Sequence, residues 1–397
     1  MSKINGIIQQ KKMASTYPNR GITFVRGEGV YLYDYEDREY LDMMSNFGVN
    51  IFGHSHPGIT RQLKEQLDKL TNLHSSFSND VRSGALKNLS SMLSNSGFSK
   101  LKRIYWGNSG TEAVEAALKF AIQSSEKTRF MAAHNSYHGK TIGALSMTTS
   151  GNRKYQKPFS SVLLSVDFVE YGDIEQIKEI LTSEHAALIL EPIQGEGGFI
   201  IPPPDYLVEV SQICKERGVI LIIDEIQTGM GRTGYFLNTE QYTDDGFEPD
   251  ILCMAKGLGG GIPVGATIIT EEINSKLSKG IQTSTFGGNP LSMAGVLAAL
   301  DFLKSSSIIE NARDVGEYFM DQLKASEIGK EIRGKGLMIG VEMEHDPIQI
   351  IKSMQQEGIL VAPSSDNTIR FLPPLTIEKN HVDLTIEQLQ KCVEYSQ

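Results

Sequence analysis

Fully apolar runs that stop at a charged residue are the clearest feature of the hydrophobic pattern. The run over residues 219–223 ends at Asp224, and the run over residues 251–255 ends at Lys256. Strands that are apolar on both faces are typical of a parallel sheet covered by helices. Ligands of such sheets bind beyond the carboxyl ends of the strands. The pattern therefore predicts that Asp224 and Lys256 face one crevice.

Short apolar runs alternate with helical patterns through the middle of the chain. The runs typical of buried strands lie at residues 103–106, 130–133, 162–166, 187–190 and 264–270. The helical patterns between them lie at residues 113–121, 174–181 and 204–218. A repeated strand–helix–strand order favours parallel strands with right-handed crossovers. The expected fold class is α/β, with a mainly parallel sheet covered by helices.

The two ends of the chain have a different pattern. Helical periodicity at residues 59–71 and 291–302 borders them. A helical lead-in and a strand hairpin lie within residues 1–50. After about residue 305 come two amphipathic helices and short strands at 340–343, 360–362 and 368–371. This change in composition predicts a second, smaller α+β unit. We expect a large domain over residues 51–295 and a small domain over residues 296–397, to which residues 1–50 contribute.

Composition and charge argue against several classes of protein. Of the 397 residues, 40% are hydrophobic and 22% are charged, which is ordinary for a globular chain. A net charge of −10 argues against a nucleic acid or an anionic membrane as the partner. Residues 1–12 lack the apolar core of a signal peptide, and no stretch has the roughly 18 apolar residues of a membrane span. We expect a cytoplasmic protein.

The cysteines and histidines do not indicate a metal or redox site. Cys214, Cys253 and Cys392 have no metal or redox spacing, so we expect reduced thiols. His54 and His56 lack partners at the spacing of metal ligands. The sequence therefore predicts no metal site.

A carboxylate and a lysine at one crevice have two interpretations. Asp224 and Lys256 could form a structural ion pair, or they could hold an aldehyde cofactor. Pyridoxal phosphate needs both groups, because a lysine forms its Schiff base and an acid keeps its ring nitrogen protonated. No Gly-x-Gly-x-x-Gly opens a helix after the first predicted strand, so the sequence does not indicate a dinucleotide fold.

Three loops after predicted strands carry further candidate residues, each with a second interpretation. Residues 107–112 (Gly-Asn-Ser-Gly-Thr-Glu) form a phosphate-binding turn or a plain helix cap. Tyr137 and His138 could stack on a flat ring or cap a loop. Glu191 and Glu196 lie in a glycine-rich loop that approaches a ligand or forms a tight surface turn.

Taken together, these segments resemble the class III (ω-amino-acid) aminotransferases, which are pyridoxal-phosphate-dependent transferases of fold type I. The matching blocks are residues 26–29, 53–57, 108–113, 137–141, 191–198, 224–229, 255–261, 285–290 and 369–375. Among the members of this family, the chain looks most like the acetylornithine and ornithine aminotransferases. The resemblance implies a large domain with a mainly parallel sheet, a smaller α+β domain, and pyridoxal 5'-phosphate as the cofactor.

The resemblance also assigns roles to individual residues. Lys256 matches the Schiff-base lysine that moves a proton during transfer, and Asp224 matches the acid on the ring nitrogen. The family completes its phosphate site with a threonine of the partner subunit, which Thr285 matches, so the resemblance implies a homodimer with a shared active site. The other residues matched to the cofactor are Ser109, Gly110, Thr111, Tyr137, His138, Glu191 and Gln227.

Substrate binding is implied for a second set of residues. Glu196 and Arg370 match a pair that admits a terminal amine when paired and a carboxylate of the 2-oxo acid when separated. Tyr17 and Phe47 stand where ornithine aminotransferases carry tyrosines near the carboxylate of the donor. Lys140 replaces an arginine that binds this carboxylate in many relatives, and a lysine cannot make the bidentate contact that an arginine makes.

The donor stays open at this stage. The loop over residues 137–146 resembles the putrescine aminotransferases, whereas residues 369–375 look more like the acetylornithine and aminoadipate-semialdehyde enzymes. Lys140 could contact the substrate or face solvent.

The resulting prediction is an aminotransferase that moves an amino group from a terminal amine to 2-oxoglutarate by a ping-pong mechanism. The expected donor is N-acetylornithine or ornithine. The alternative donors are putrescine, another diamine or 4-aminobutyrate. An aminomutase or an amino-acid epimerase on the same scaffold is a further alternative. A non-catalytic binding protein would be expected to have lost Lys256 or Asp224.

Overall fold

A seven-stranded sheet forms the centre of the computed structural model, which describes residues 6, 8–9, 11–364 and 367–395. Its strands are β4 (Leu101–Gly107), β5 (Arg129–Ala133), β6 (Val166–Val169), β7 (His185–Leu190), β8 (Ile220–Asp224), β9 (Ile251–Met254) and β10 (Gly265–Thr270). They lie in the order β4-β10-β9-β8-β7-β5-β6, and only β10 runs antiparallel to its neighbours. The predicted α/β fold with a mainly parallel sheet is confirmed.

The central strands are apolar throughout because both faces of the sheet are buried. Successive side chains of a strand point to opposite faces. Leu221 and Ile223 of β8 join the larger hydrophobic core on one face, and Ile222 joins a second core on the other. Helix α5 (Gly110–Ser125) covers the second core with a run of alanines. The ends of these buried strands are consequently the places where polar side chains reach a ligand.

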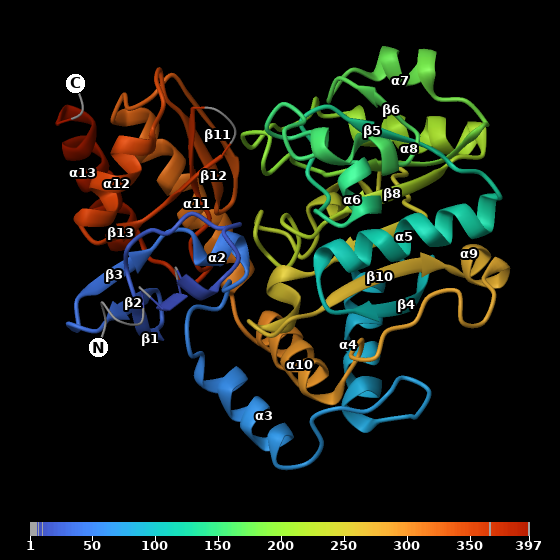
Figure 1. Ribbon diagram of the computed structural model, residues 1–397, viewed down its shortest axis with the longest axis horizontal. Helices are drawn as coiled ribbons and strands as arrows, with labels where there is room; N and C mark the ends of the chain where they lie inside the picture. Colours follow the sequence, from blue (N-terminus) through green and yellow to red (C-terminus); the bar gives the residue numbers. More distant parts are fainter. Residues whose placement is uncertain (1–5, 7, 10, 365–366, 396–397) are drawn as a thin grey trace.

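The opposite face of the sheet packs against several helices, as Figure 1 shows. These are α4 (Asp80–Asn95), α7 (Ile174–Ile180), α8 (Tyr206–Arg217) and α10 (Pro290–Ser305), with α3 (Pro57–Leu67) packed on α10. No single helix of the described chain has the length and apolarity of a membrane span. Only α10 and α11 (Ile308–Ala325), taken together across a bend of 69°, have that composition.

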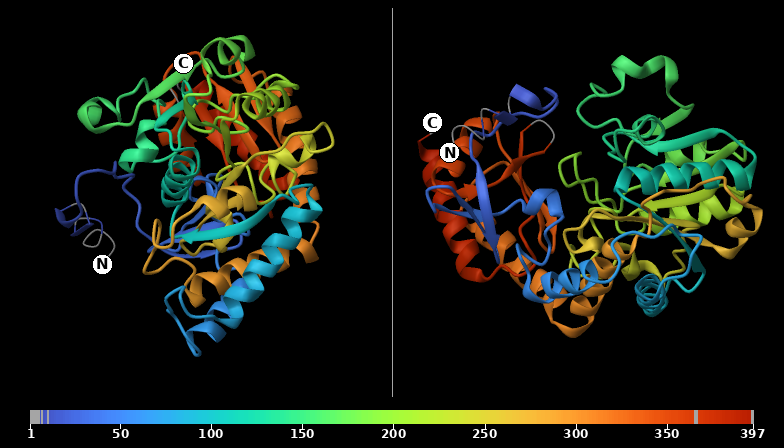
Figure 2. Two further views of the ribbon diagram at one scale, coloured as in Figure 1. Left: turned by 90° about the vertical axis from the view of Figure 1, so that its right-hand side faces the viewer. Right: turned by 60° about the horizontal axis from the view of Figure 1, so that its bottom comes forward.

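The N-terminal and C-terminal segments lie together beside the large sheet (Figures 1 and 2). Two small sheets hold them: β1 (Phe24–Glu28), β2 (Tyr31–Asp34), β3 (Glu39–Asp42) and β13 (Ile359–Leu360) form one, and β11 (Glu331–Lys335), β12 (Met338–Glu342), β15 (Thr368–Phe371) and β14 (Ala362–Pro363) form the other. Ile359 of β13 pairs in parallel with Leu41 of β3. The two ends of the chain therefore share one sheet.

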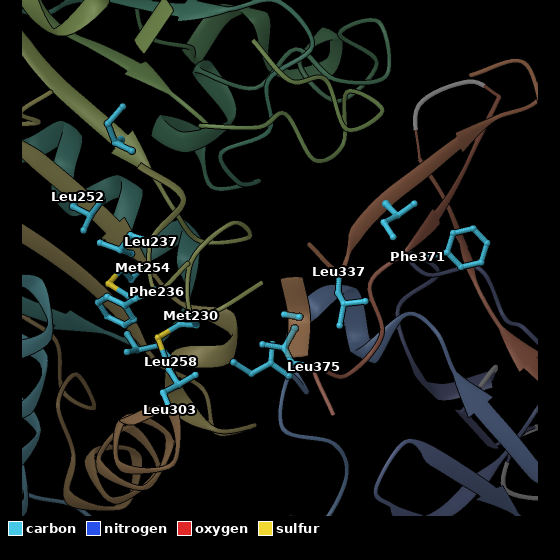
Figure 3. Close-up of a cluster of buried hydrophobic side chains, with 14 of the residues drawn as sticks. Met230, Phe236, Leu237, Leu252, Met254, Leu258, Leu303, Leu337, Phe371 and Leu375 are labelled. Atoms are coloured by element: carbon cyan, nitrogen blue, oxygen red, sulfur yellow. The ribbon is translucent and has the colours of Figure 1, made fainter. Parts of the chain in front are cut away.

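One hydrophobic core joins the large sheet to the C-terminal segment. Figure 3 shows Leu252 and Met254 of β9 on one side and Leu337 and Phe371 on the other, with Leu375 between them. All five side chains are buried in the same cluster. This shared core holds the C-terminal segment against the part of the sheet that carries Asp224 and Lys256.

Some of the sequence-based element predictions are wrong. The strand expected at residues 162–166 lies at 166–169 instead, because Val162 ends a short 3-10 helix and is 56% exposed. Among the described residues after 305 there are three helices rather than two, namely α11, α12 (Ile348–Gln356) and α13 (Lys379–Glu394). The hydrophobic pattern does not predict strand β11, because its sequence, Glu-Ile-Arg-Gly-Lys, is mostly polar. The lead-in helix expected near the N-terminus lies partly outside the described residues.

Candidate active site

A cavity of about 570 Å³ lies beyond the carboxyl ends of β8 and β9. Asp224 ends β8, and Lys256 follows β9 by two residues, so adjacent parallel strands bring both to the cavity. Of the residues predicted for the site, those that line the cavity are Tyr17, Ser109, Gly110, Thr111, Tyr137, His138, Lys140, Glu191, Glu196, Asp224, Gln227 and Lys256. The structure thus brings most of the predicted residues together.

Three predicted residues do not line the cavity. Arg370 and Phe47 lie just behind it, where the guanidinium carbon of Arg370 is 4.7 Å from the centre of the Phe47 ring. Arg370 reaches the cavity through Glu196, since its Nη1 lies 2.5 Å from Glu196 Oε1. Thr285 is exposed and stands outside this cavity in the single chain.

Asp224 is held by two donors at the floor of the cavity. His138 Nδ1 lies 2.8 Å from Asp224 Oδ2, and the backbone N–H of Ile226 donates to Asp224 Oδ1 at 3.0 Å. Burial opposes a charge on the His138 ring, but the hydrogen bond to Asp224 and the negative charges of Asp224 and Glu191 together outweigh it and raise the pKa of His138. The His138 ring and the Ile226 N–H together orient the Asp224 carboxylate.

Glu191 joins two loops rather than pointing freely into the cavity. Its carboxylate accepts the backbone N–H of Tyr137 at 3.1 Å and that of Gly195 at 3.3 Å. Burial raises its pKa to about 7, and the negative charge of Asp224 adds to the shift. Glu191 therefore ties the loop after β5 to the loop after β7, both of which line the cavity.

Lys256 is buried at the start of a short 3-10 helix. Its backbone has a φ of 46°, in the left-handed region that few non-glycine residues adopt. Burial lowers the pKa of its side chain to about 8. About a tenth of Lys256 is therefore at pH 7 in the neutral form that a nucleophilic or basic amine requires.

The turn before α5 both caps the helix and leaves room for an anion. Ser109 Oγ accepts the backbone N–H of Glu112 at 3.3 Å, which is an N-cap contact. A Cβ atom added to Gly110 would lie 2.9 Å from Ile226 Cδ1, so a larger residue would collide with Ile226 at the cavity wall. The remaining N–H groups and the helix dipole favour an anion there.

The residues present fit pyridoxal phosphate. Two buried polar atoms of cavity residues, His138 Nε2 and Gln227 Oε1, have no hydrogen-bond partner among the described residues. Buried polar atoms without partners favour a polar ligand. A lysine of lowered pKa, an oriented carboxylate and a helix N-terminus stand around the same cavity.

Sequence reasoning assigns no role to several cavity residues, among them Asn46, Ile226 and residues 262–264. Asn46 lies in a turn where Ser45, Asn46 and Phe47 all have positive φ, from 39° to 59°. An asparagine two residues before Gly48 is a weak signal of such a turn. Residues 262–264 follow the glycines after Lys256, which indicate a loop but not its direction.

Comparison with known proteins gives a consistent result. Residues 12–393 match the model of the family Aminotransferase class-III. The acetylornithine aminotransferase of Aquifex aeolicus is 38% identical over 96% of this chain and 99% of its own length. The [LysW]-aminoadipate semialdehyde transaminase of Deinococcus radiodurans is 37% identical over 97% of this chain and 89% of its own. The crystal structure of the ornithine aminotransferase from Toxoplasma gondii ME49 is 30% identical, with a TM-score of 0.91 over 100% of this chain and 96% of that one.

Proposed function

The chain belongs to the class III aminotransferases, which depend on pyridoxal phosphate, and on this premise we propose that it transfers an amino group from a terminal-amine donor to 2-oxoglutarate by a ping-pong mechanism. The observation that carries the proposal is the ion pair between Glu196 and Arg370 beside the cavity. N-acetylornithine or ornithine is the leading donor, since relatives with those substrates in their names resemble the chain over nearly its whole length.

Different residues around the cavity would hold different parts of the cofactor. When bound, pyridoxal phosphate supplies a conjugated ring that withdraws electrons from the carbon bearing the transferred amino group. Asp224, oriented by His138, would hold the ring nitrogen, and the turn at residues 109–111 would hold the phosphate. Gln227 Oε1 is buried in the described chain without a partner and would meet a polar group of the ring, and Tyr137 would cover a face of the ring.

Lys256 carries the proton-transfer role in this proposal. Its Nζ has a pKa of about 8 because it is buried, so it can accept a proton near neutral pH and return it. A general base of this kind works best when its pKa lies near the working pH. Lys256 Nζ would take the proton from the carbon that bears the amino group of the donor.

The Glu196–Arg370 pair explains how one cavity admits two unlike substrates. The side chain of Arg370 is 5% exposed and that of Glu196 is 31% exposed, so the pair is shielded on one side only. Two unit charges about 4 Å apart in a partly shielded site interact by roughly 4 kcal/mol. An incoming carboxylate of 2-oxoglutarate can therefore replace Glu196 at little net cost. With the pair closed, Arg370 is occupied and the end of the donor that carries the amine can enter.

Removing the acid of this pair tests the proposal. Glu196→Ala should lower the KM for glutamate, because Arg370 is then permanently free, and should lower kcat/KM for N-acetylornithine or another terminal-amine donor. Steady-state kinetics with each donor measure both effects. Glu342→Ala, which breaks the pair with Arg333 outside the cavity, is the matched control. Unchanged kinetics for both donors in Glu196→Ala would contradict the gate.

The alternative reactions predict different products. An aminomutase or an epimerase would isomerise the donor without consuming a 2-oxo acid, and neither needs an arginine that alternates between two partners. Donors added without any 2-oxo acid should convert the yellow enzyme in one half-reaction, which its visible spectrum reports. Regeneration of the starting spectrum by 2-oxoglutarate would support the ping-pong sequence.

A further inference from the structure

Four consecutive residues beside the active-site cavity have a strained backbone. Ser45, Asn46, Phe47 and Gly48, labelled α2 in Figure 1, have φ values of 39°, 52°, 59° and 87°. Three of the four carry side chains, for which this left-handed region is unfavourable. A backbone of this kind persists only where the surrounding structure holds it. The Ser45–Gly48 turn therefore depends on contacts from outside it.

Asp42 holds the start of the turn. Its Oδ1 accepts the backbone N–H groups of Met44 at 3.1 Å and Ser45 at 2.8 Å. The residue is 1% exposed, and its Oδ2 lies 2.7 Å from Nε2 of His54. His54 belongs to residues 53–57, a block to which the proposed function assigns no role. The His54 ring thus orients the carboxylate that holds the turn.

The turn is also tied to the strand that carries Arg370. Ser45 Oγ donates to the carbonyl of Leu372, and the N–H of Leu372 donates to the carbonyl of Met43 at 2.8 Å. Leu372 directly follows β15 and lies two residues beyond Arg370. A shift of the turn would therefore change the surroundings of Arg370.

The turn places Phe47 against two polar groups of the active site. The guanidinium carbon of Arg370 lies 4.7 Å from the centre of the Phe47 ring, within the range of a cation–π attraction. The carbonyl of Phe47 accepts from Gln227 Nε2 at 3.4 Å. Arg370 Nε is buried without a hydrogen-bond partner among the described residues. Once a substrate carboxylate replaces Glu196, the orientation of the guanidinium therefore depends on the Phe47 ring.

Asp42 and His54 lie outside the cavity that receives the substrate. They line a separate cavity of about 240 Å³, and Asn46 of the turn lines both cavities. We infer that Asp42 and His54 are positioning residues for the acceptor, which act through the Ser45–Gly48 turn on Arg370. The inference rests on the proposed exchange of Glu196 for a carboxylate at Arg370.

Binding of an unreactive dicarboxylate tests this positioning without catalysis. Glutarate has the two carboxylates of 2-oxoglutarate but no carbonyl that can react, so calorimetric titration of the holoenzyme gives its Kd. Asp42→Ala should weaken glutarate binding about tenfold, as expected for the loss of hydrogen bonds to a charged group. Asp42→Asn, whose side-chain oxygen can still accept both N–H groups, should weaken it by less than about threefold.

The two half-reactions should respond differently to the same change. In Asp42→Ala, kcat/KM for 2-oxoglutarate should fall about tenfold. For N-acetylornithine it should fall by less than about threefold, because Glu196 then holds Arg370. A residue that only stabilises the fold would lower both values to the same extent.

Asp34→Ala is the matched control. Asp34 Oδ1 also accepts two backbone N–H groups of a following turn, those of Glu36 at 2.9 Å and Arg38 at 3.1 Å. Asp34 ends β2 and lines neither cavity. Its replacement should leave glutarate binding and both values of kcat/KM unchanged.

Glu196→Ala separates failure of the inference from failure of the exchange on which it rests. Glutarate should bind Glu196→Ala more tightly than the wild type. If it binds both alike, the exchange is wrong and the inference falls with it. If Glu196→Ala binds more tightly but Asp42→Ala changes the Kd no more than Asp34→Ala does, the positioning role is overturned while the exchange stands.

Variants of His54 decide the inference if Asp42→Ala does not fold. His54→Leu removes the polar contact to Asp42 and should weaken glutarate binding about threefold. His54→Gln keeps an N–H donor and should restore the affinity. Equal affinity of these two variants and the wild type would overturn the role of the pair.

Discussion

At the scale of single residues, Glu191 is a carboxylate whose burial changes its titration. Its pKa is raised to about 7 in the folded chain, above its value in an unfolded chain, so the folded state binds more protons between these two values. Stability is therefore lost as the pH rises through this window, from about 4.5 to about 7. Above about pH 7, the folded state bears the full free-energy cost of the buried carboxylate charge.

Glu191→Gln should remove this cost. As the pH rises from 5 to 8, the free energy of unfolding of the variant should increase relative to that of the wild type by at most about 3 kcal/mol. Urea midpoints of the cofactor-free proteins at several pH values measure this change. Glu184→Gln, at an exposed position, is the control. A difference that does not vary with pH would contradict the raised pKa.

Residue-level prediction from sequence succeeds where the residue type itself carries chemistry. Asp224 and Lys256 end apolar strands, so the hydrophobic pattern alone predicts that they face one crevice, and both line the cavity. The contact between Lys140 and Tyr155 cannot be found in this way, because the two residues lie fifteen positions apart and neither belongs to a helix or strand. No periodicity relates two loop residues, so only the fold reveals their contact.

At the scale of elements, the N-terminus of α5 has two tasks that a substitution can separate. Ser109 caps the helix by accepting the N–H of Glu112, and the same turn faces the cavity. Aspartate is as good a cap as serine, but it brings a negative charge to the place proposed for a phosphate.

Ser109→Asp should therefore keep the stability of the cofactor-free protein and lose most of its affinity for pyridoxal phosphate. Ser109→Ala should lose roughly 1 kcal/mol of stability and retain more of the affinity. Thermal unfolding and fluorescence titration with the cofactor measure the two quantities. If aspartate binds the cofactor as well as serine does, the turn is only a helix cap.

Element prediction is accurate for buried strands and poor at the edge of the sheet and in the C-terminal segment. Strands β7 and β8 are buried on both faces, so their apolar runs alone identify them. Strand β6 lies at the edge of the sheet and contains the polar residue Asp167, which pairs with Arg129. Its sequence therefore mixes polar and apolar residues and does not read as an apolar run. Within the described chain, strand β11 pairs with one neighbour only, and none of its five residues is fully buried.

At the scale of the whole molecule, the contacts support a small domain made from both ends of the chain. β3 pairs with β13, and one core runs from Met254 to Leu337. Arg232 adds a buried link, since its Nη1 donates to the carbonyls of Leu337 at 2.9 Å and Pro373 at 2.6 Å. We propose on these contacts that residues 1–50 and 296–397 form the small domain and residues 51–295 the large one.

The assembly is the last proposal, and Thr285 tests it. Thr285 is exposed and does not line the cavity of its own chain, although the resemblance matches it to a phosphate-binding threonine. The neighbouring Phe286 is 58% exposed, so this turn is open to contact with a second subunit. We propose a homodimer in which each chain supplies Thr285 to the cavity of the other.

Mixed dimers of two inactive variants distinguish a shared site from two separate sites. Co-expression of Lys256→Ala with Thr285→Asp should restore about a quarter of wild-type activity, because half of randomly paired dimers are mixed and each mixed dimer contains one intact site. Lys256→Ala with Asp224→Ala should restore none, because both residues line the cavity of one chain. If the first mixture is as inactive as the second, Thr285 serves its own chain or no site at all, and the shared site is wrong.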